Sequence, residues 1–236
     1  MARRRDPERF DQLVEAAIRA FVAHGGFSRT SIDDVAKELG VAKGTVYLYV
    51  QSKEALFDLC LRRADAAEPM GEPPLPVPTP EGGATLEYVR ELLGKSALFG
   101  PLDAMLTAPE PVMPVRDELT RLADELYRLL AENRATIRLI NASARDLPEL
   151  GELWYGTARG GLNKKLATYF SRRTMTGHLR PMPDPVSAAR LFTETTFWFA
   201  VNRAFDPQPD AIDDELGRAT VRTALLRTFL PCEDSP

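Results

Sequence analysis

The residues with the clearest chemistry lie between positions 43 and 53 of this 236-residue chain. Lys43 and Thr45 carry groups that hydrogen-bond to base edges in the major groove of DNA. Tyr47 and Tyr49 carry hydroxyls that donate to phosphates. Gly44 lets a helix approach a duplex closely, although glycine costs roughly 1 kcal/mol relative to alanine there. This combination favours contact with double-stranded DNA over the alternative, an ordinary helical bundle with half-buried tyrosines.

Two short helices are predicted to position these side chains. Ser31 is followed three residues later by Asp34, which is the spacing of a capping box, and an apolar pattern of helical period runs from residue 32 to residue 39. Gly40 comes directly after it and supplies the left-handed conformation that ends a helix. A second helix is predicted over residues 43–50, with Val46 and Val50 facing inward. The pair has the layout of a helix-turn-helix.

Flanking helices and a basic arm complete this region. A first helix is predicted from residue 7 to the Gly25-Gly26 pair, and Ser52 is expected to cap a helix that runs from Lys53 to about residue 67. A phosphate at that helix start would meet Lys53 and free backbone N–H groups. Three arginines near the N-terminus form either an arm that contacts DNA or a solvated tail. The predicted DNA-contacting residues are Arg3, Arg4, Arg5, Arg29, Thr30, Ser31, Lys43, Gly44, Thr45, Tyr47, Tyr49 and Lys53.

The quoted segments resemble the DNA-binding domain of the tetracycline-repressor (TetR) family of bacterial regulators. The resemblance covers roughly residues 10–61 and rests on Phe21 to Gly25, Thr30-Ser31, Val35-Ala36, Gly40-Val41, Lys43-Gly44-Thr45-Val46-Tyr47 and Ser52-Lys53-Glu54-Ala55-Leu56-Phe57. Three positions depart from the family pattern: Gly26 adds a residue before Thr30, Ala42 replaces a capping Ser or Thr, and Val50 replaces an aromatic residue. The resemblance implies a homodimeric regulator that binds an operator and is released by a small molecule.

Composition limits the other classes of function. Residues 1–63 hold 11 Lys and Arg against 9 Asp and Glu, whereas the remainder holds 19 against 25, so a mildly basic head precedes an acidic body. Two cysteines and two histidines give no metal-ligand or disulfide pattern, and no nucleophile or phosphate-loop motif is present. We therefore expect no enzyme, no metal and no cofactor. With no apolar run of bilayer length and no signal peptide, a cytoplasmic location without membrane contact is expected.

The predicted fold class is all-α, with a helix-turn-helix domain over residues 1–67, a connector over 68–83 and a larger helical body over 84–236. Six prolines in residues 69–83 make the connector a surface loop, a semi-rigid spacer or a ligand for a proline-recognition domain. Helices are predicted in the body over residues 86–99, 102–107, 153–175, 186–205 and 211–230. A long one near 119–145 is expected to bend or split near Asn133, and no alternating strand pattern appears.

The last two helices are expected to form a homodimer interface, because residues 191–201 are apolar on more than one face. Burial within one subunit is the alternative. The predicted interface residues are Phe192, Phe197, Val201, Leu216, Ala219, Leu226 and Leu230.

An apolar pocket in the body with a few polar groups is the second expectation. Its predicted lining residues are Tyr88, Phe99, Tyr127, Arg138, Asn141, Trp154, Tyr155, Phe170 and Trp198, with Arg145 as a further polar candidate; core packing is the alternative for each aromatic. A ligand that prefers one body conformation would shift the population and release DNA. Two alternatives stay open here: a body that binds a protein partner, and activation of transcription in place of repression.

Overall fold

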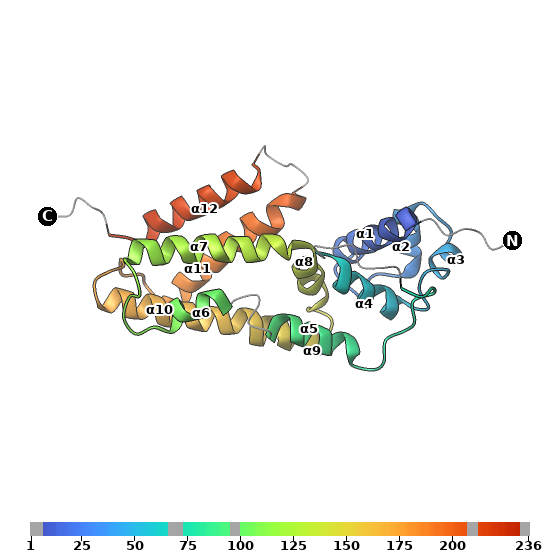
Figure 1. Ribbon diagram of the computed structural model, residues 1–236, viewed down its shortest axis with the longest axis horizontal. Helices are drawn as coiled ribbons and strands as arrows, with labels where there is room; N and C mark the ends of the chain where they lie inside the picture. The colour runs from blue at the N-terminus through green and yellow to red at the C-terminus, as the bar shows by residue number, and fades with distance from the viewer. Residues whose placement is uncertain (1–6, 66–72, 95–99, 207–211, 232–236) are drawn as a thin grey trace. The chain divides into compact units, whose positions relative to one another are not determined.

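The computed structural model of the protein describes residues 7–65, 73–94, 100–206 and 212–231 (Figure 1). The prediction of an all-α fold is confirmed. The described residues also contain an isolated parallel β-bridge between Val50 and Val77. The helices are α1 (Pro7–Ala23), α2 (Ile32–Leu39), α3 (Lys43–Val46), α4 (Lys53–Arg63), α5 (Ala84–Gly94), α6 (Gly100–Thr107), α7 (Val115–Glu132), α8 (Arg134–Ser143), α9 (Pro148–Gly151), the π-helix η1 (Glu152–Arg159), α10 (Gly160–Met175), α11 (Pro185–Phe197), the π-helix η2 (Trp198–Asn202), the 3-10 helix η3 (Arg203–Phe205) and α12 (Asp214–Phe229).

Several helix ends follow the local sequence. The predicted long helix splits at Asn133 into α7 and α8. The helix predicted over residues 43–50 is shorter and ends at Val46. Beyond it, the carbonyl of Tyr49 accepts a hydrogen bond from the backbone N–H of Val77 (2.7 Å). None of the described helices is long and apolar enough to cross a bilayer.

Two compact units make up the chain. Unit 1 holds residues 1–92 and 133–155, and unit 2 holds residues 93–132 and 156–236. Because α5, α8 and α9 fall in unit 1, the units do not follow the predicted boundary at residue 84, and the three predicted domains stay a prediction.

The core of unit 1 is built around aromatic residues. The ring of Phe57 on α4 lies 5.4 Å from that of Phe21 on α1 and 5.0 Å from that of Phe27 in the α1–α2 loop, measured between centroids. Helix α8 packs against both α1 and α4. At its start, the carboxylate of Asp65 accepts hydrogen bonds from the backbone of Ala135 (3.1 Å) and Thr136 (2.7 Å). An acidic cap of this kind satisfies backbone donors that a helix start leaves free.

The described part of the proline-rich segment, residues 73–83, is fastened to the turn between α3 and α4. Gln51 donates its backbone N–H to the carbonyl of Val77 (2.9 Å), and the hydroxyl of Thr79 donates to that of Ser52 (2.8 Å). We call residues 73–83 the strap. The strap holds the backbone at the end of α3.

Unit 2 contains α6, α7, α10, α11 and α12, with α10 packed closely along α11 (Figure 1). Phe170, Phe192 and Phe229 form one aromatic cluster, and the rings of Phe170 and Phe229 are 4.5 Å apart. Glu118 on α7 and Arg173 on α10 form a buried ion pair, with Nε 3.0 Å from Oε2. The hydroxyl of Tyr169 and the backbone N–H of Val112 also donate to Glu118, so its carboxylate is well satisfied.

Candidate nucleic-acid interface

The start of α2 fixes the geometry of the helix-turn-helix. Ser31 accepts a hydrogen bond from the backbone of Asp34, whose carboxylate accepts in return from the backbone of Ser31 (2.9 Å), so the predicted capping box is present. The hydroxyl of Ser31 also donates to the carboxylate of Asp34 (2.6 Å), and this hydrogen bond, with the one from the backbone of Ser31, lowers the pKa of Asp34. Gly40 ends α2 with φ of 72°, the left-handed conformation expected of glycine at this position.

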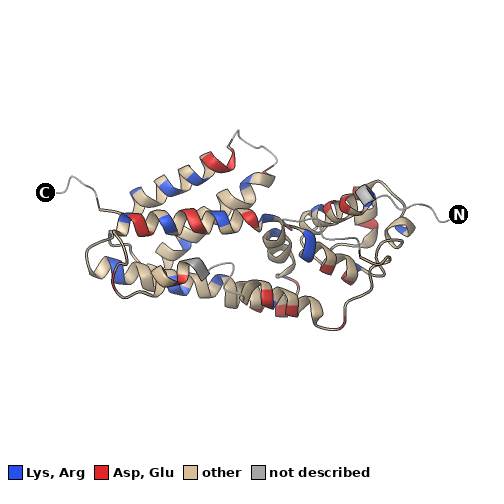
Figure 2. Ribbon diagram, viewed as in Figure 1, with Lys and Arg blue, Asp and Glu red and all other residues tan. Residues whose placement is uncertain are grey.

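Four residues of α3 and the turn that follows it are accessible to solvent on the outer face. Lys43 and Gly44 are exposed, Thr45 is partly exposed and Tyr47 is 42% exposed. A Cβ placed on Gly44 would meet nothing within 4 Å, so this position leaves open space on the protein's side. Figure 2 shows a basic band on α3 and acidic bands nearby on α2. The face is therefore accessible to a duplex.

The prediction that Tyr49 lies on this outer face is wrong. Its side chain is 5% exposed and packs against Phe10, so it does not offer a hydroxyl to phosphate. Leu48, 53% exposed, takes the outer place that the sequence analysis missed. The signal was available: Val46, Tyr49 and Val50 follow the i, i+3, i+4 spacing of an inward face.

The ammonium of Lys43 lies 2.9 Å from the carboxylate of Asp33 on α2. This hydrogen bond and the charge of Asp33 raise the pKa of Lys43, which stays protonated. Both side chains are about half exposed, so the pair is a weak one that a phosphate can replace.

Three other predicted contacts are held within the protein. Thr30 is buried and its hydroxyl donates to the carbonyl of Gly26 (2.8 Å). Lys53 donates to the carbonyls of Phe27 (3.0 Å) and Thr30 (3.1 Å) and lies over the ring of Phe27. Arg29 pairs with Asp146 beyond α8. Thr30 and Lys53 satisfy carbonyls of the α1–α2 loop, and Arg29 satisfies a carboxylate that follows α8; their contacts with DNA stay predictions. Arg3, Arg4 and Arg5 lie outside the described residues.

The extra residue noted at Gly26 has a structural role. Its φ is +113°, and a Cβ there would lie 2.6 Å from the carbonyl oxygen of Ala142 and 2.7 Å from the Cα of Ser143. The next residue, Phe27, donates its backbone N–H to the hydroxyl of Ser143 (3.1 Å). Only glycine permits this close approach, and the loop is thereby docked on the last turn of α8.

The predicted ligand-lining residues are divided between the two units. Tyr88, Arg138, Asn141, Trp154 and Tyr155 belong to unit 1, whereas Tyr127, Phe170 and Trp198 belong to unit 2; Phe99 lies outside the described residues. Most have internal roles. The ring of Tyr88 stacks under the guanidinium of Arg62, and the indole of Trp154 donates to Asn141 (3.0 Å). Tyr127 is buried and donates to Asp214 (3.2 Å).

Two further corrections concern aromatic residues of that set. Trp198 is 43% exposed, so it lines no enclosed space in its own unit. Phe170 packs in the aromatic cluster of unit 2. Arg138 keeps a partly buried position that lowers its pKa, because burial disfavours the charge. Arg145 is exposed.

The predicted interface residues divide into two groups. Phe192, Val201 and Leu230 are buried in unit 2, so for them the alternative of burial within the subunit is correct. Phe197, Ala219 and Leu226 are partly exposed, and Leu216 is 51% exposed. Two residues that the analysis did not name, Leu191 and Trp198, add large exposed apolar groups on α11 and η2.

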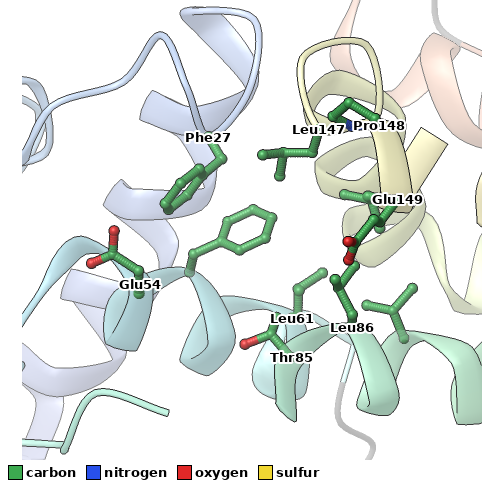
Figure 3. Close-up of a pocket in the computed structure, with 11 residues that line it drawn as sticks. Phe27, Glu54, Leu61, Thr85, Leu86, Leu147, Pro148 and Glu149 are labelled. Atoms are coloured by element: carbon green, nitrogen blue, oxygen red, sulfur yellow. The ribbon is translucent and has the colours of Figure 1, made fainter. Parts of the chain in front are cut away.

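Unit 1 contains an open apolar pocket of about 350 Å³ that the sequence analysis did not foresee (Figure 3). Four segments line it: the α1–α2 loop, α4, α5 and the turn that begins α9. The lining residues are Phe27, Glu54, Phe57, Leu61, Thr85, Leu86, Val89, Leu147, Pro148, Glu149 and Leu150. In the described ranges no cluster of His, Cys, Asp or Glu is arranged to hold a metal ion.

Comparison with known proteins supports the assignment of the helix-turn-helix region. Residues 13–60 match the family model of bacterial regulatory proteins of the tetR family, and residues 117–232 match that of the C-terminal domain of AefR-like transcriptional repressors. Two Bacillus subtilis proteins match short segments: the HTH-type regulator YerO, 43% identical over 49 residues, and the fatty acid metabolism regulator protein, 37% identical over 46. These matches cover 21% and 20% of this chain, and 17% and 23% of the relatives' lengths.

Solved structures of similar fold align with most of the chain. A tetR-family regulatory protein from Rhodococcus RHA1 aligns over 97% of this chain and 100% of its own, with a TM-score of 0.53 and 20% identity. A transcriptional regulator from Saccharomonospora viridis, solved in complex with choline, aligns over 96% and 100%, with a TM-score of 0.51 and 16% identity. With both family models matched in sequence order and an exposed recognition face on α3, the chain belongs to the TetR family and is a DNA-binding transcriptional regulator.

Proposed function

We propose that the protein is a homodimeric repressor that binds a palindromic operator in the bacterial cytoplasm and leaves it when a small molecule binds. The observation that carries the proposal is the outer face of α3, where Lys43, Gly44, Thr45 and Tyr47 are accessible together. A short helix with these groups fits the major groove, with Lys43 and Thr45 at base edges and Tyr47 at a phosphate.

Dimerisation is proposed through α11, η2 and α12. Leu191 and Trp198 are each 43% exposed and stand two helical turns apart, and Leu216 on α12 is more exposed still. Large exposed apolar groups of this kind mark association surfaces. A two-fold dimer would place two recognition helices on half-sites one helical turn, roughly 34 Å, apart.

Release is proposed to act through α8. This helix is attached at both ends to the helix-turn-helix region of residues 7–65, which we call the reading head. Asp65 contacts its start, and Gly26 and Phe27 contact its last turn. A ligand that favours another position of α8 would therefore reposition the head. Its preference between the two conformations sets how far the DNA-bound population falls.

Fluorescence anisotropy with labelled DNA from upstream of the protein's own gene tests the DNA-binding proposal, with random DNA of equal length as the competitor. We expect two protomers per palindrome. Thr45→Ala should cost roughly 1–3 kcal/mol at particular base pairs. Tyr47→Phe should weaken binding to all sequences alike.

Lys43→Ala should weaken specific binding to the operator. Lys164→Ala, which changes an exposed lysine of α10, is its matched control and should bind as the parent does. Equal affinity of the parent protein for operator and random DNA would contradict the assignment of α3. Transcription from that promoter in a purified system then separates repression, which lowers transcript yield, from activation, which raises it.

Sedimentation tests the dimer. Trp198→Glu combined with Leu216→Glu should convert the dimer to a monomer. Met175→Glu, at an 84% exposed apolar position of α10, should leave it dimeric. A double variant that sediments as a dimer would overturn the proposed interface.

A further inference from the structure

We propose that the apolar pocket of unit 1 binds the alkyl part of an amphiphilic cation, with the cationic group held by carboxylates at its rim. The pocket lies at the low end of the range for small-molecule sites, roughly 300–1,000 Å³. The proposal has two parts, an apolar cavity and an acidic rim, and both come from the described residues of unit 1.

The cavity is apolar and built from residues already held in place. Phe57, Leu61, Val89 and Leu150 are buried, and their side chains form its walls. When an apolar ligand group enters such a site, its surface is removed from water. Each Å² of buried apolar surface stabilises the complex by about 25 cal/mol. The walls favour an alkyl or aromatic group and offer few hydrogen-bond partners.

The rim is acidic. Figure 3 shows the carboxylates of Glu54 and Glu149 on opposite sides of the pocket. Both are exposed, and neither forms an ion pair with any residue that the structure describes. The nearby cations are already engaged: Lys53 with the carbonyls of Phe27 and Thr30, and Arg29 with Asp146.

A second, polar depression adjoins the first and shares Leu86 and Glu149 with it. It is lined by Glu81, Gly82, Gly83, Ala84, Leu86, Glu87, Arg90 and Glu149. Its one lining cation, Arg90, pairs with Glu87 on the same helix. Figure 2 shows the acidic bands on α5. With Glu54, the two depressions carry four carboxylates against one guanidinium, so their charge suits a cationic group and repels a carboxylate or phosphate.

Binding is measured first, without DNA, by isothermal titration of the full chain. The probes are octyltrimethylammonium and octanoate, each below the concentration at which it forms micelles, and octanol, below its solubility limit. The cation should bind at least tenfold more tightly than octanoate. Octanoate binding as tightly as the cation overturns the proposal.

Variants of the rim and the wall locate the site. Glu54→Gln with Glu149→Gln should weaken binding of the cation about fivefold and leave that of octanol unchanged, since exposed charge pairs contribute about 0.2–1 kcal/mol each. Glu152→Gln removes an exposed carboxylate of unit 1 that lines neither depression and should change nothing. Leu86→Trp should abolish binding of both probes by filling the pocket. An unchanged affinity in the double glutamine variant, which preserves the side-chain shapes, overturns the proposal.

The action of such a cation as the effector rests on the proposed function and is measured separately, as operator affinity at saturating octyltrimethylammonium. If the cation lowers operator affinity in the parent protein but not in Leu86→Trp, the result supports both the site and release of DNA through it. Binding with unchanged operator affinity supports the site and contradicts ligand release through it. Operator release without binding to this pocket contradicts the site alone.

Discussion

The guanidinium of Arg29 meets the carboxylate of Asp146 at two points, with Nε 2.8 Å from Oδ2 and Nη2 3.2 Å from Oδ1. Arg29 lies in the α1–α2 loop and Asp146 follows α8, 117 residues later. The pair stands beside the contact of Phe27 with Ser143. Arg29 therefore takes part in docking the loop on α8, and we propose that its role in DNA binding is indirect.

Variants of this pair distinguish docking from a phosphate contact. If Arg29 acts by docking the loop, Arg29→Ala and Asp146→Ala should lower operator affinity to the same small extent, and the double variant should add nothing. The dependence of affinity on salt should not change. If Arg29 contacted a phosphate, Arg29→Ala alone would reduce the salt slope by about one. Anisotropy titrations at three salt concentrations measure both quantities.

Gly26→Ala should destabilise unit 1 and weaken operator binding. Its Cβ would overlap the backbone of Ala142 and Ser143, which cannot move as a flexible side chain does. Gly25→Ala is the matched comparison. It shares a positive φ of 87°, yet its Cβ would meet nothing nearer than 3.5 Å, on the side chain of Arg29. Urea unfolding should therefore show the larger loss for Gly26→Ala; equal losses would remove the close approach to α8 as the cause.

Gly44→Ala should act in the opposite way on stability. The position lies in α3 with ordinary helical backbone and open space around it, so alanine should stabilise the fold by up to about 1 kcal/mol. The new methyl group would stand on the face proposed to approach DNA, and operator affinity should fall. A variant that is more stable and binds DNA as well as the parent would show that this position does not come near the duplex.

The buried pair of Glu118 and Arg173 should be sensitive to single substitutions. Their side chains are 0% and 1% exposed. Arg173→Met leaves a buried carboxylate with two remaining donors, and the expected loss is about 3–5 kcal/mol. Glu118→Met with Arg173→Met removes both charges and should cost less than Arg173→Met alone. Urea unfolding of the two variants measures the difference, and a larger loss in the double variant would contradict it.

Cys60 should be inert in the folded protein. It is fully buried on α4, and burial raises the pKa of its thiol, which disfavours the reactive thiolate. In a Cys232→Ser background, a disulfide reagent at pH 8 should react at least about a hundredfold more slowly with the native protein than with protein in urea.

The sign of the pH dependence of Cys60 follows from the raised pKa. The unfolded state loses this proton near pH 8.5, while the folded state keeps it. The stability contributed by the neutral thiol is therefore complete below that pH and declines above it. Cys60→Ser should show a smaller decline between pH 8 and pH 10, and parallel declines would contradict this account.

Local sequence signals predicted the elements of the reading head well. Ser31, Asp34 and Gly40 act through neighbours along the chain, so their spacing alone identified the capping box and the helix end. The inward face of Val46 was visible in the same way. The prediction for Tyr49 was wrong because it rested on the chemistry of the hydroxyl alone, whereas the helical spacing from Val46 indicates the inward face.

Long-range contacts were not predictable in this way. Arg29, Thr30 and Lys53 have polar groups that suit phosphates, and only the fold shows that loop carbonyls and Asp146 occupy them. The pocket of unit 1 draws its walls from residues near 27, 57, 86 and 150. The residue pattern of a single helix cannot predict that four separate segments of the chain line one pocket. The predicted lining residues were chosen by type alone, and they fall in two units.

The attachment of α8 to the reading head sets a rule for building hybrid regulators. A chimera that exchanges only residues 1–65 would give Asp65 a foreign helix start to cap and would bring Gly26 and Arg29 against a foreign last turn. Residues 133–146 would have to be exchanged with the head, and the strap with its Val77 backbone contacts as well. The portable module of this regulator is therefore discontinuous in the chain, and its transplantable specificity includes a helix far from the DNA-reading sequence.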